Sequence, residues 1–134
     1  MKIYITAPFK NEENKNEIER LCNLVKESGF EDFCFIRDIE NYQKIFNDLH
    51  ELMDKTKEEL LKCDGLLIDV SDNPSSGQAI EAGMAYILKK KIIIIAKKGT
   101  TIKDTMKGIA DSLIEYEKIE DILEPLKKLY SMWQ

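Results

Sequence analysis

The sequence predicts an α/β protein of the flavodoxin-like (Rossmann-like) class, with a five-stranded parallel sheet flanked by helices. Strand-like and helix-like patterns alternate along the whole chain, with no internal repeat, low-complexity tract or Pro/Gly-rich linker. The run Gly65–Val70 is apolar almost throughout, which is typical of a central parallel strand covered on both faces. With 134 residues, we expect one domain spanning 1–134 and no second one.

The first half of the chain predicts two strands and two helices. Pro8 ends the first strand and Gly29 closes the first helix, because these residues interrupt regular structure. The apolar residues of each helix recur at the spacing of a single helical face. The expected bounds are Lys2–Ala7 and Phe33–Ile36 for the strands, and Asn11–Ser28 and Asn41–Lys62 for the helices.

The second half continues the alternation. Its expected strands are Gly65–Val70, Ile92–Ala96 and Leu113–Tyr116, and its expected helices are one that carries Glu81 and ends at Lys89–Lys91, one over Thr105–Ala110 and one over Ile119–Tyr130. In open parallel sheets, ligands bind at the carboxyl ends of the strands. The turns Thr6–Phe9 and Ser71–Gly77 are expected at that edge.

Composition excludes several classes of function. The net charge of −5 and the pI near 5.0 give no broad basic surface for nucleic acid. No apolar run is long enough to span a bilayer, so we expect no membrane partner. The chain opens directly into the strand-like run Ile3–Ile5, so we expect no signal peptide.

The cysteines and the single histidine predict neither disulfides nor a metal. Three scattered cysteines, Cys22, Cys34 and Cys63, suit buried free thiols in a reducing cytoplasm. With His50 as the only histidine and no Cys-x-x-Cys pair, a structural zinc site is not expected, and no feature calls for a cofactor.

A turn rich in Ser and Gly lies between the strand Gly65–Val70 and the next helix. Small residues there expose backbone N–H groups at the helix start, where the helix dipole favours an anion such as a phosphate. Ser75, Ser76 and Gly77 are therefore candidate phosphate ligands, and they serve equally as a simple helix N-cap. The two roles are compatible.

Glu81, early in that helix, is the candidate for chemistry. Helical glutamates are usually solvated, but small neighbours let this helix approach a sheet or another chain closely, so Glu81 is expected to line a cleft. These neighbours are Ala79, Ala82, Gly83 and Ala85. Asp69 ends the buried strand, where it either faces the site or only hydrogen-bonds the following turn.

Several segments carry a family resemblance. Ile3-Tyr4 is followed by the turn Ala7-Pro8-Phe9, Cys63-Asp64 precedes the apolar strand, and Gly77–Ala85 follows the pattern Gly-x-x-x-Glu-x-Gly-x-Ala. Together they resemble the nucleoside 2-deoxyribosyltransferases and their relatives, the 2′-deoxynucleoside 5′-monophosphate N-glycosidases. Met106–Ser112 is similar to the family segment that reaches into the neighbouring subunit's site.

The resemblance implies cleavage of an N-glycosidic bond, with Glu81 as nucleophile and a glycosyl-enzyme that water or a second base resolves. Tyr4 would position the nucleophile or the sugar. The substrate would be a small nucleotide or nucleoside. The implied substrate-binding residues are Ala7, Phe9, Asp69, Ser75, Gly77 and Ser112, the last reaching the phosphate from the other subunit of a homodimer.

Ser75 favours one branch of the family. Pro74–Gly77 resembles the phosphate-binding turn of the nucleotide hydrolases, whereas transferases that accept unphosphorylated nucleosides tend to carry an acid in place of Ser75. A hydrolase acting on a nucleotide is therefore favoured over a base-exchanging transferase.

Two positions depart from the family pattern. Thr56 stands where family members usually have an Asp that helps to handle the leaving base, and Asp54 and Glu58 are the nearby substitutes. Pro8 replaces the small hydroxyl residue that many of the hydrolases have in the first turn, and Lys10 is the nearest source of positive charge. The base, and ribose against deoxyribose, stay open.

The competing class is a non-catalytic nucleotide sensor or signalling domain on the same sheet. A response-regulator receiver needs an acidic pair at the end of its first strand to hold magnesium. Thr6-Ala7-Pro8 supplies no carboxylate, so the receiver is excluded.

Overall fold

A parallel sheet of five strands, in the order β2-β1-β3-β4-β5, forms the centre of the computed structural model, which describes residues 1–134. The predicted fold class is confirmed. The strands are β1 (Lys2–Thr6), β2 (Glu31–Cys34), β3 (Gly65–Asp69), β4 (Lys91–Lys97) and β5 (Ser112–Tyr116).

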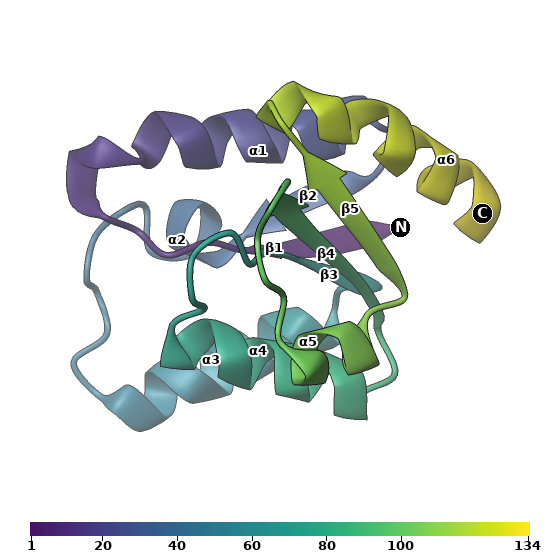
Figure 1. Ribbon diagram of the computed structural model, residues 1–134. Helices are drawn as coiled ribbons and strands as arrows, with labels where there is room; N and C mark the ends of the chain where they lie inside the picture. The colour runs from purple at the N-terminus through teal and green to yellow at the C-terminus, as the bar shows by residue number, and fades with distance from the viewer.

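Helices cover both faces of this sheet (Figure 1). One face carries α1 (Lys15–Glu27), the 3-10 turn η2 (Ile119–Ile122) and α6 (Leu123–Trp133). The other carries α3 (Leu49–Leu61), α4 (Ser76–Ile87) and α5 (Asp104–Ile109). The short elements η1 (Asn11–Glu13) and α2 (Phe35–Asp38) follow β1 and β2.

Alternation along the strands divides the core in two. Successive side chains of a strand point to opposite faces, so Ile3 and Ile5 join the core under α1 and α6, whereas Tyr4 joins the core under α3 and α4. Every residue of the β4 run Ile92–Ala96 is buried. The apolar strands identified in the sequence are therefore apolar because both of their faces are covered.

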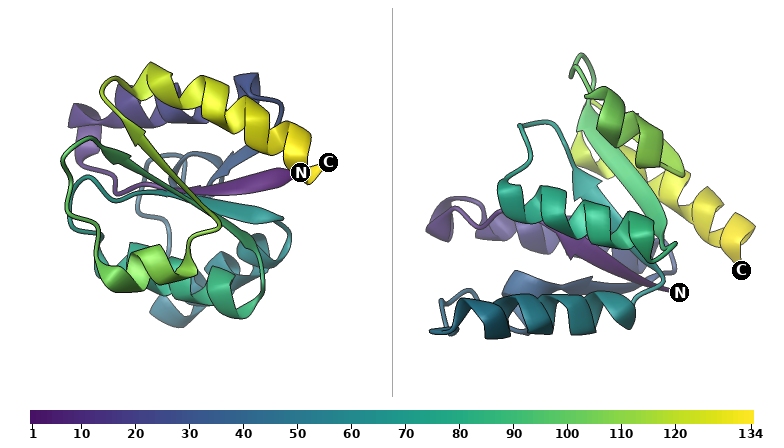
Figure 2. Two further views of the ribbon diagram at one scale, coloured as in Figure 1. Left: turned by 45° about the vertical axis from the view of Figure 1, so that its right-hand side comes forward. Right: turned by 90° about the horizontal axis from the view of Figure 1, so that it is seen from below.

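The carboxyl ends of the strands carry the turns that matter for function. The β1–η1 and β3–α4 turns lie at the same edge, and the two termini lie together at the other (Figure 2). Gly29, which follows α1, has φ +115°, and a Cβ there would approach the Tyr130 ring to 2.8 Å. It therefore ends α1 as predicted, in a conformation that suits glycine.

The helix predicted over Asn41–Lys62 is wrong for its first part. Asn41 and Tyr42 have φ of 49° and 59°, in the left-handed region, so no helix runs through them. The helix begins only at Leu49, where the side chain of Asp48 accepts a hydrogen bond from the backbone N–H of His50 at 2.8 Å. The strand predicted at Phe33–Ile36 ends at Cys34, and α2 follows it directly.

The helix predicted over Asn11–Ser28 is interrupted near its start. Asn11 has φ 59°, and Asn14 lies between η1 and α1 instead of inside one helix. The Asn14 side chain bonds the preceding turn, which competes with helical structure. The last helix likewise begins at Leu123 instead of Ile119, after the 3-10 turn η2.

Candidate active site

Glu81 points from α4 to the end of β1. The Tyr4 hydroxyl donates to Glu81 Oε2, and Thr6 Oγ1 donates to Glu81 Oε1 at 2.8 Å. Tyr4 and Thr6 are two residues apart on one strand, so both side chains face α4. Glu81 is half-buried, and each of its oxygens has a donor, so the carboxylate is held in one orientation against the sheet.

Burial dominates the electrostatics of this group. It raises the pKa of Glu81 above the usual range, while the hydrogen bonds from Tyr4 and Thr6 oppose that rise and the negative charge of Glu40 adds to it. Burial and the adjacent Glu81 charge together raise the pKa of Tyr4 far above its ordinary value. Tyr4 is therefore a neutral donor, and Glu81 is the group of this pair that titrates.

A capping box starts α4 beside this carboxylate. Ser75 Oγ accepts from the backbone N–H of Gln78 at 3.2 Å, and Gln78 Oε1 accepts from the backbone N–H of Ser75 at 3.0 Å. The Gln78 amide also donates to the Thr6 carbonyl at 3.5 Å, which links the start of α4 to the end of β1. The box leaves the backbone N–H groups of Ser76 and Gly77 without a helical partner.

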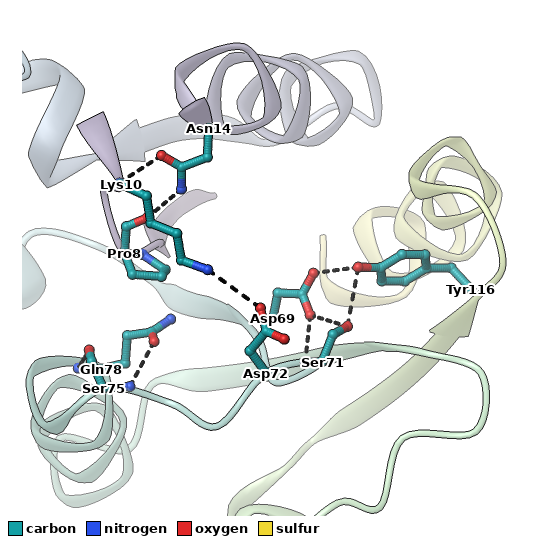
Figure 3. Close-up of polar contacts among 9 residues, drawn as sticks. All are labelled: Pro8, Lys10, Asn14, Asp69, Ser71, Asp72, Ser75, Gln78 and Tyr116. Atoms are coloured by element: carbon teal, nitrogen blue, oxygen red, sulfur yellow. Dashed lines mark hydrogen bonds and ion pairs between the residues drawn. The ribbon is translucent and has the colours of Figure 1, made fainter. Parts of the chain in front are cut away.

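The β1–η1 turn is fixed from within. Asn14 Oδ1 accepts from the backbone N–H of Lys10 at 2.7 Å, and Asn14 Nδ2 donates to the Pro8 carbonyl at 2.6 Å (Figure 3). Lys10 Nζ then lies 3.7 Å from Asp72 Oδ2, on the β3–α4 turn. This ion pair joins the two turns across the mouth of the site.

Asp69 is held by a network of hydrogen bonds at the end of β3. Its Oδ1 accepts from the Ser71 backbone N–H at 2.9 Å and from Ser71 Oγ at 2.6 Å, and its Oδ2 accepts from the Tyr116 hydroxyl at 2.5 Å (Figure 3). Burial, with the bond to Asp69, raises the pKa of Tyr116 to about 12. Asp69 thus ties the β3–α4 turn to β5.

A cavity of about 700 Å³ opens between the ends of β1 and β3. That volume falls in the range of small-molecule sites. Three of the residues predicted to bind substrate line it, namely Ala7, Asp69 and Ser75. Thr6, whose side chain bonds Glu81, lines the cavity too, whereas Glu81 and Tyr4 do not.

The fold is shared with known nucleoside enzymes. The CMP N-glycosidase BcmB of Clostridium botulinum is 24% identical, with a TM-score of 0.72 over 97% of this chain and 99% of that one. A 2-deoxyribosyltransferase of Bacillus psychrosaccharolyticus is 22% identical, with a TM-score of 0.74 over 92% of this chain and 90% of that one. A 2-deoxyribosyltransferase of Leishmania mexicana is 19% identical, with a TM-score of 0.57 over 78% of this chain and 75% of that one.

The chain has the fold of these enzymes. Neither a protein-family model nor a curated protein sequence matches it. Identities below one in four establish the common fold alone, so the assignment of an activity to this deoxyribosyltransferase-like fold depends on the side chains of its site.

Two predicted residues lie beside the cavity without lining it. Gly77 is exposed in the first turn of α4, and a Cβ there would have only Ser75 Oγ, at 3.8 Å, within contact range. A side chain at this position would therefore meet little of the protein. Phe9 packs its ring against Tyr42 with centroids 5.3 Å apart, which turns it towards the α1 side of the sheet.

Ser112 lies at the opposite edge of the molecule. It begins β5 and is in register with Ile93, near the amino end of β4. Three strand spacings of about 4.8 Å separate β5 from β1, to which Glu81 is bonded. This serine therefore does not reach the Glu81 of its own chain.

Four residues of the site went unrecognised in the sequence: Thr6, Asn14, Gln78 and Tyr116. The first had a usable signal, because strand alternation puts Thr6 on the face of Tyr4. Gln78 had one as well, since Ser75 and Gln78 have the spacing of a capping box. No local pattern identifies Asn14 or Tyr116, whose bonds reach back to a turn and across the sheet.

No group of three or more His, Cys, Asp or Glu side chains is arranged to hold a metal ion. None of the helices combines the length and the apolar content that a membrane span requires.

Proposed function

We propose that this protein hydrolyses the N-glycosidic bond of a nucleoside or deoxynucleoside 5′-monophosphate, as a member of the nucleoside deoxyribosyltransferase family. The observation that carries the proposal is the Glu81 carboxylate, held by Tyr4 and Thr6 in the second turn of a helix with a capped start. The fold shared with a CMP N-glycosidase and with 2-deoxyribosyltransferases supports it.

In the proposed reaction, ionised Glu81 attacks C1′ of the sugar. A bond forms between its carboxylate oxygen and C1′, while the C1′–N bond breaks and its electron pair leaves with the base. Water then attacks C1′ and displaces the Glu81 carboxylate, which gives free base and sugar phosphate. The donors Tyr4 and Thr6 keep the nucleophile aimed and favour its charged form against burial.

The phosphate is assigned to the turn before α4. Ser75 and Lys10 both line the cavity, and Ser76 and Gly77 are exposed in the first turn of α4, where their backbone N–H groups have no helical partner. Ser75 is neutral, so it does not repel a phosphate. This is the specific reason to favour a nucleotide hydrolase over a transferase of unphosphorylated nucleosides.

We also propose a homodimer, in which Ser112 of one subunit serves the site of the other. The distance of Ser112 from the Glu81 of its own chain supports a contribution in trans. The three free and buried cysteines support a reducing, cytoplasmic setting.

The test is chromatography of the common ribo- and deoxyribonucleoside 5′-monophosphates and nucleosides after incubation with the protein, with and without a second free base. Free base with sugar phosphate identifies the hydrolase, whereas a newly formed nucleoside identifies the transferase. Glu81→Gln should lose activity by about 10³-fold or more, and the exposed Glu115→Gln should not. Nucleotide binding with no base release would establish the sensor function instead and refute the enzyme.

A further inference from the structure

The outer side of α4 carries no charge. Glu81 is the only charged residue between Ser76 and Ile87, and its side chain points to Tyr4 and Thr6 on β1. A surface helix normally presents charged and polar residues to water. The other long helices do so, with Glu17 and Lys26 exposed on α1, Lys57 and Glu58 on α3, and Glu124 and Lys127 on α6.

Apolar side chains take the place of charges on α4. Ile80 and Ile87 are 48% and 78% exposed, and with Gly83 between them they follow the spacing of one helical face. We call these three residues the α4 face. Helix α4 is the middle helix of its layer, between α3 and α5 (Figure 1, Figure 2). Exposed apolar side chains that gather on one face mark a contact surface for another macromolecule.

The absent side chain of Gly83 is not required by its own chain. Glycine weakens a helix interior relative to alanine, and a Cβ at Gly83 would meet no heavy atom within 4 Å. A second helix packed across α4 gives the glycine a role, because the distance between two packed helices depends on the side chains at their contact. Gly83 is therefore the point at which another backbone can approach α4 most closely.

A second copy of this chain is the partner that suits the α4 face. In a dimer with two-fold symmetry the same patch lies on both sides of the contact, so a charged patch would meet its own charge. The chain carries a net charge of −5, and the α4 face adds no repulsion between like charges. Apolar side chains such as Ile80 and Ile87 need only burial, so they suit their own copies.

The orientation of the two copies follows from the position of Ser112. Helix α4 runs from the carboxyl edge of the sheet, where Glu81 bonds β1, back to the amino edge, where Ser112 begins β5. Two parallel copies of α4 would keep like edges together and leave Ser112 at the wrong edge for Glu81. A two-fold axis that crosses α4 at Gly83 instead turns the amino edge of one subunit towards the carboxyl edge of the other.

We propose that the α4 face is the interface of the homodimer, in which the two copies of α4 cross at Gly83 and Ser112 of each subunit reaches the Glu81 site of the other. The placement of Ser112 rests on the proposed function, whereas the interface itself rests on the exposure and the missing charge of α4. Dissociation of the dimer would leave each Glu81 in place and remove one residue from each site. Base release would then depend on protein concentration.

The first experiment measures the oligomeric state by sedimentation equilibrium over a range of protein concentrations. Met132, an apolar side chain of α6 that is 73% exposed, provides the control for Ile87. Wild type and Met132→Glu should be dimers. Ile87→Glu would bury an unpaired carboxylate in the interface, so it should raise the dissociation constant of the dimer by about 100-fold or more. Circular dichroism and a thermal midpoint establish that each variant is folded.

The second experiment tests the crossing point by disulfide cross-linking. The three native cysteines are buried, so a new surface cysteine is the accessible thiol of the folded protein. Gly83→Cys should form a covalent dimer on oxidation, because helices that cross there bring two Cα atoms to about the 4.4–6.8 Å that a disulfide spans. Ile87→Cys should not, because it lies about 6 Å farther along the helix, and the two copies diverge from the crossing point.

Base release from nucleoside 5′-monophosphates is the third measurement. Ile87 ends α4, at the opposite end from the capped start, so Ile87→Glu leaves the bonds of Glu81 to Tyr4 and Thr6 in place. Its activity should fall in step with the fraction of dimer and recover as the protein concentration rises. Damage confined to one subunit would lower activity equally at every concentration.

A monomeric wild type, or an Ile87→Glu variant that dimerises as tightly as Met132→Glu, would overturn the interface, and base release by the wild type would still support the proposed function. Cross-linking of Ile87→Cys as readily as of Gly83→Cys would show parallel helices and overturn the placement of Ser112. Full base release by Ile87→Glu monomers would overturn that placement too. If no nucleotide releases base while sedimentation and cross-linking give the expected results, the interface stands and the proposed function falls.

Discussion

Tyr4 and Glu81, 77 residues apart in sequence, meet through a hydrogen bond from the phenol to the carboxylate. The contact joins β1 to α4 at the edge of the sheet where the two functional turns lie. Because the Tyr4 ring is fully buried, the phenol is fixed, and it fixes the carboxylate in turn. The geometry of the candidate nucleophile is therefore set by the sheet as well as by its own helix.

Removing that phenol should weaken the nucleophile and shift its titration. A hydrogen bond to a charged group is worth about 2 kcal/mol, so Tyr4→Phe should lower kcat for base release by roughly 30-fold. Glu81 must be ionised to attack, and the lost donor raises its pKa further, so the acid limb of the pH–rate profile should move to higher pH. Profiles of kcat/KM for wild type and variant measure the shift. Tyr86→Phe, on an exposed tyrosine of α4, is the control. An acid limb at an unchanged pH would show that Tyr4 does not tune Glu81.

Burial of Glu81 should make the fold less stable as its carboxyl ionises. The folded pKa is raised above the unfolded value of about 4.3, so the folded state holds its proton longer than the unfolded state as pH rises. Stability is then lost with rising pH, by about 1.4 kcal/mol per unit between the unfolded and the folded pKa. We therefore expect the free energy of unfolding of Glu81→Gln minus that of wild type, measured in urea, to increase with pH across that window and to stay constant above it. Glu115→Gln, at an exposed site, should show no such trend. A constant difference at all pH values would contradict the raised pKa.

Substitutions at Ser75 can separate capping from phosphate binding. Aspartate caps a helix about as well as serine, so Ser75→Asp should fold with wild-type stability, whereas Ser75→Ala should lose about 1 kcal/mol. A carboxylate there would repel a phosphate, so KM for nucleoside 5′-monophosphates should rise by about 10-fold or more in Ser75→Asp. The response to unphosphorylated nucleosides should not change. Equal effects on both substrate classes would place the phosphate elsewhere.

The hydrogen bond from Tyr116 to Asp69 should contribute more to the stability of the fold than to the rate of base release. Tyr116→Phe removes one donor from Asp69 and leaves the Ser71 bonds in place, so we expect a loss of about 1–2 kcal/mol in unfolding free energy. Tyr116 does not contact Glu81, so kcat for base release should stay within about twofold of wild type. Unfolding in urea and steady-state kinetics measure the two quantities. A large fall in kcat with unchanged stability would assign Asp69 to the reaction itself.

Continuous apolar runs made the central strands of the sheet predictable. Runs such as Ile92–Ala96 are continuous because both faces are covered, and that signal is local. The error at Asn41 and Tyr42 has the opposite origin. Their left-handed backbone is accompanied by packing of the Tyr42 ring against Phe9 and by its hydroxyl bond to Glu19 at 2.6 Å, contacts that no local periodicity encodes.

Part of the candidate site was also predictable from a local signal in the sequence. The Ser75 turn and Glu81 follow one another along the chain, so their proximity could be inferred from a strand, a turn and a helix. Thr6 has a local signal as well, because alternation along β1 places it on the same face as Tyr4. The contact of Asp69 with Tyr116 depends on segments that meet only in the folded sheet.

The position of Ser112 at the amino edge of β5 has a consequence for mixtures of variants. In the proposed dimer, a subunit with Glu81→Gln still lends its serine, and a subunit with Ser112→Ala still carries its nucleophile. Neither variant alone would hold an intact pair of groups, but a hybrid of the two would contain one complete centre. If activity returned when the two inactive preparations were mixed, each active site would be shown to contain residues of two subunits.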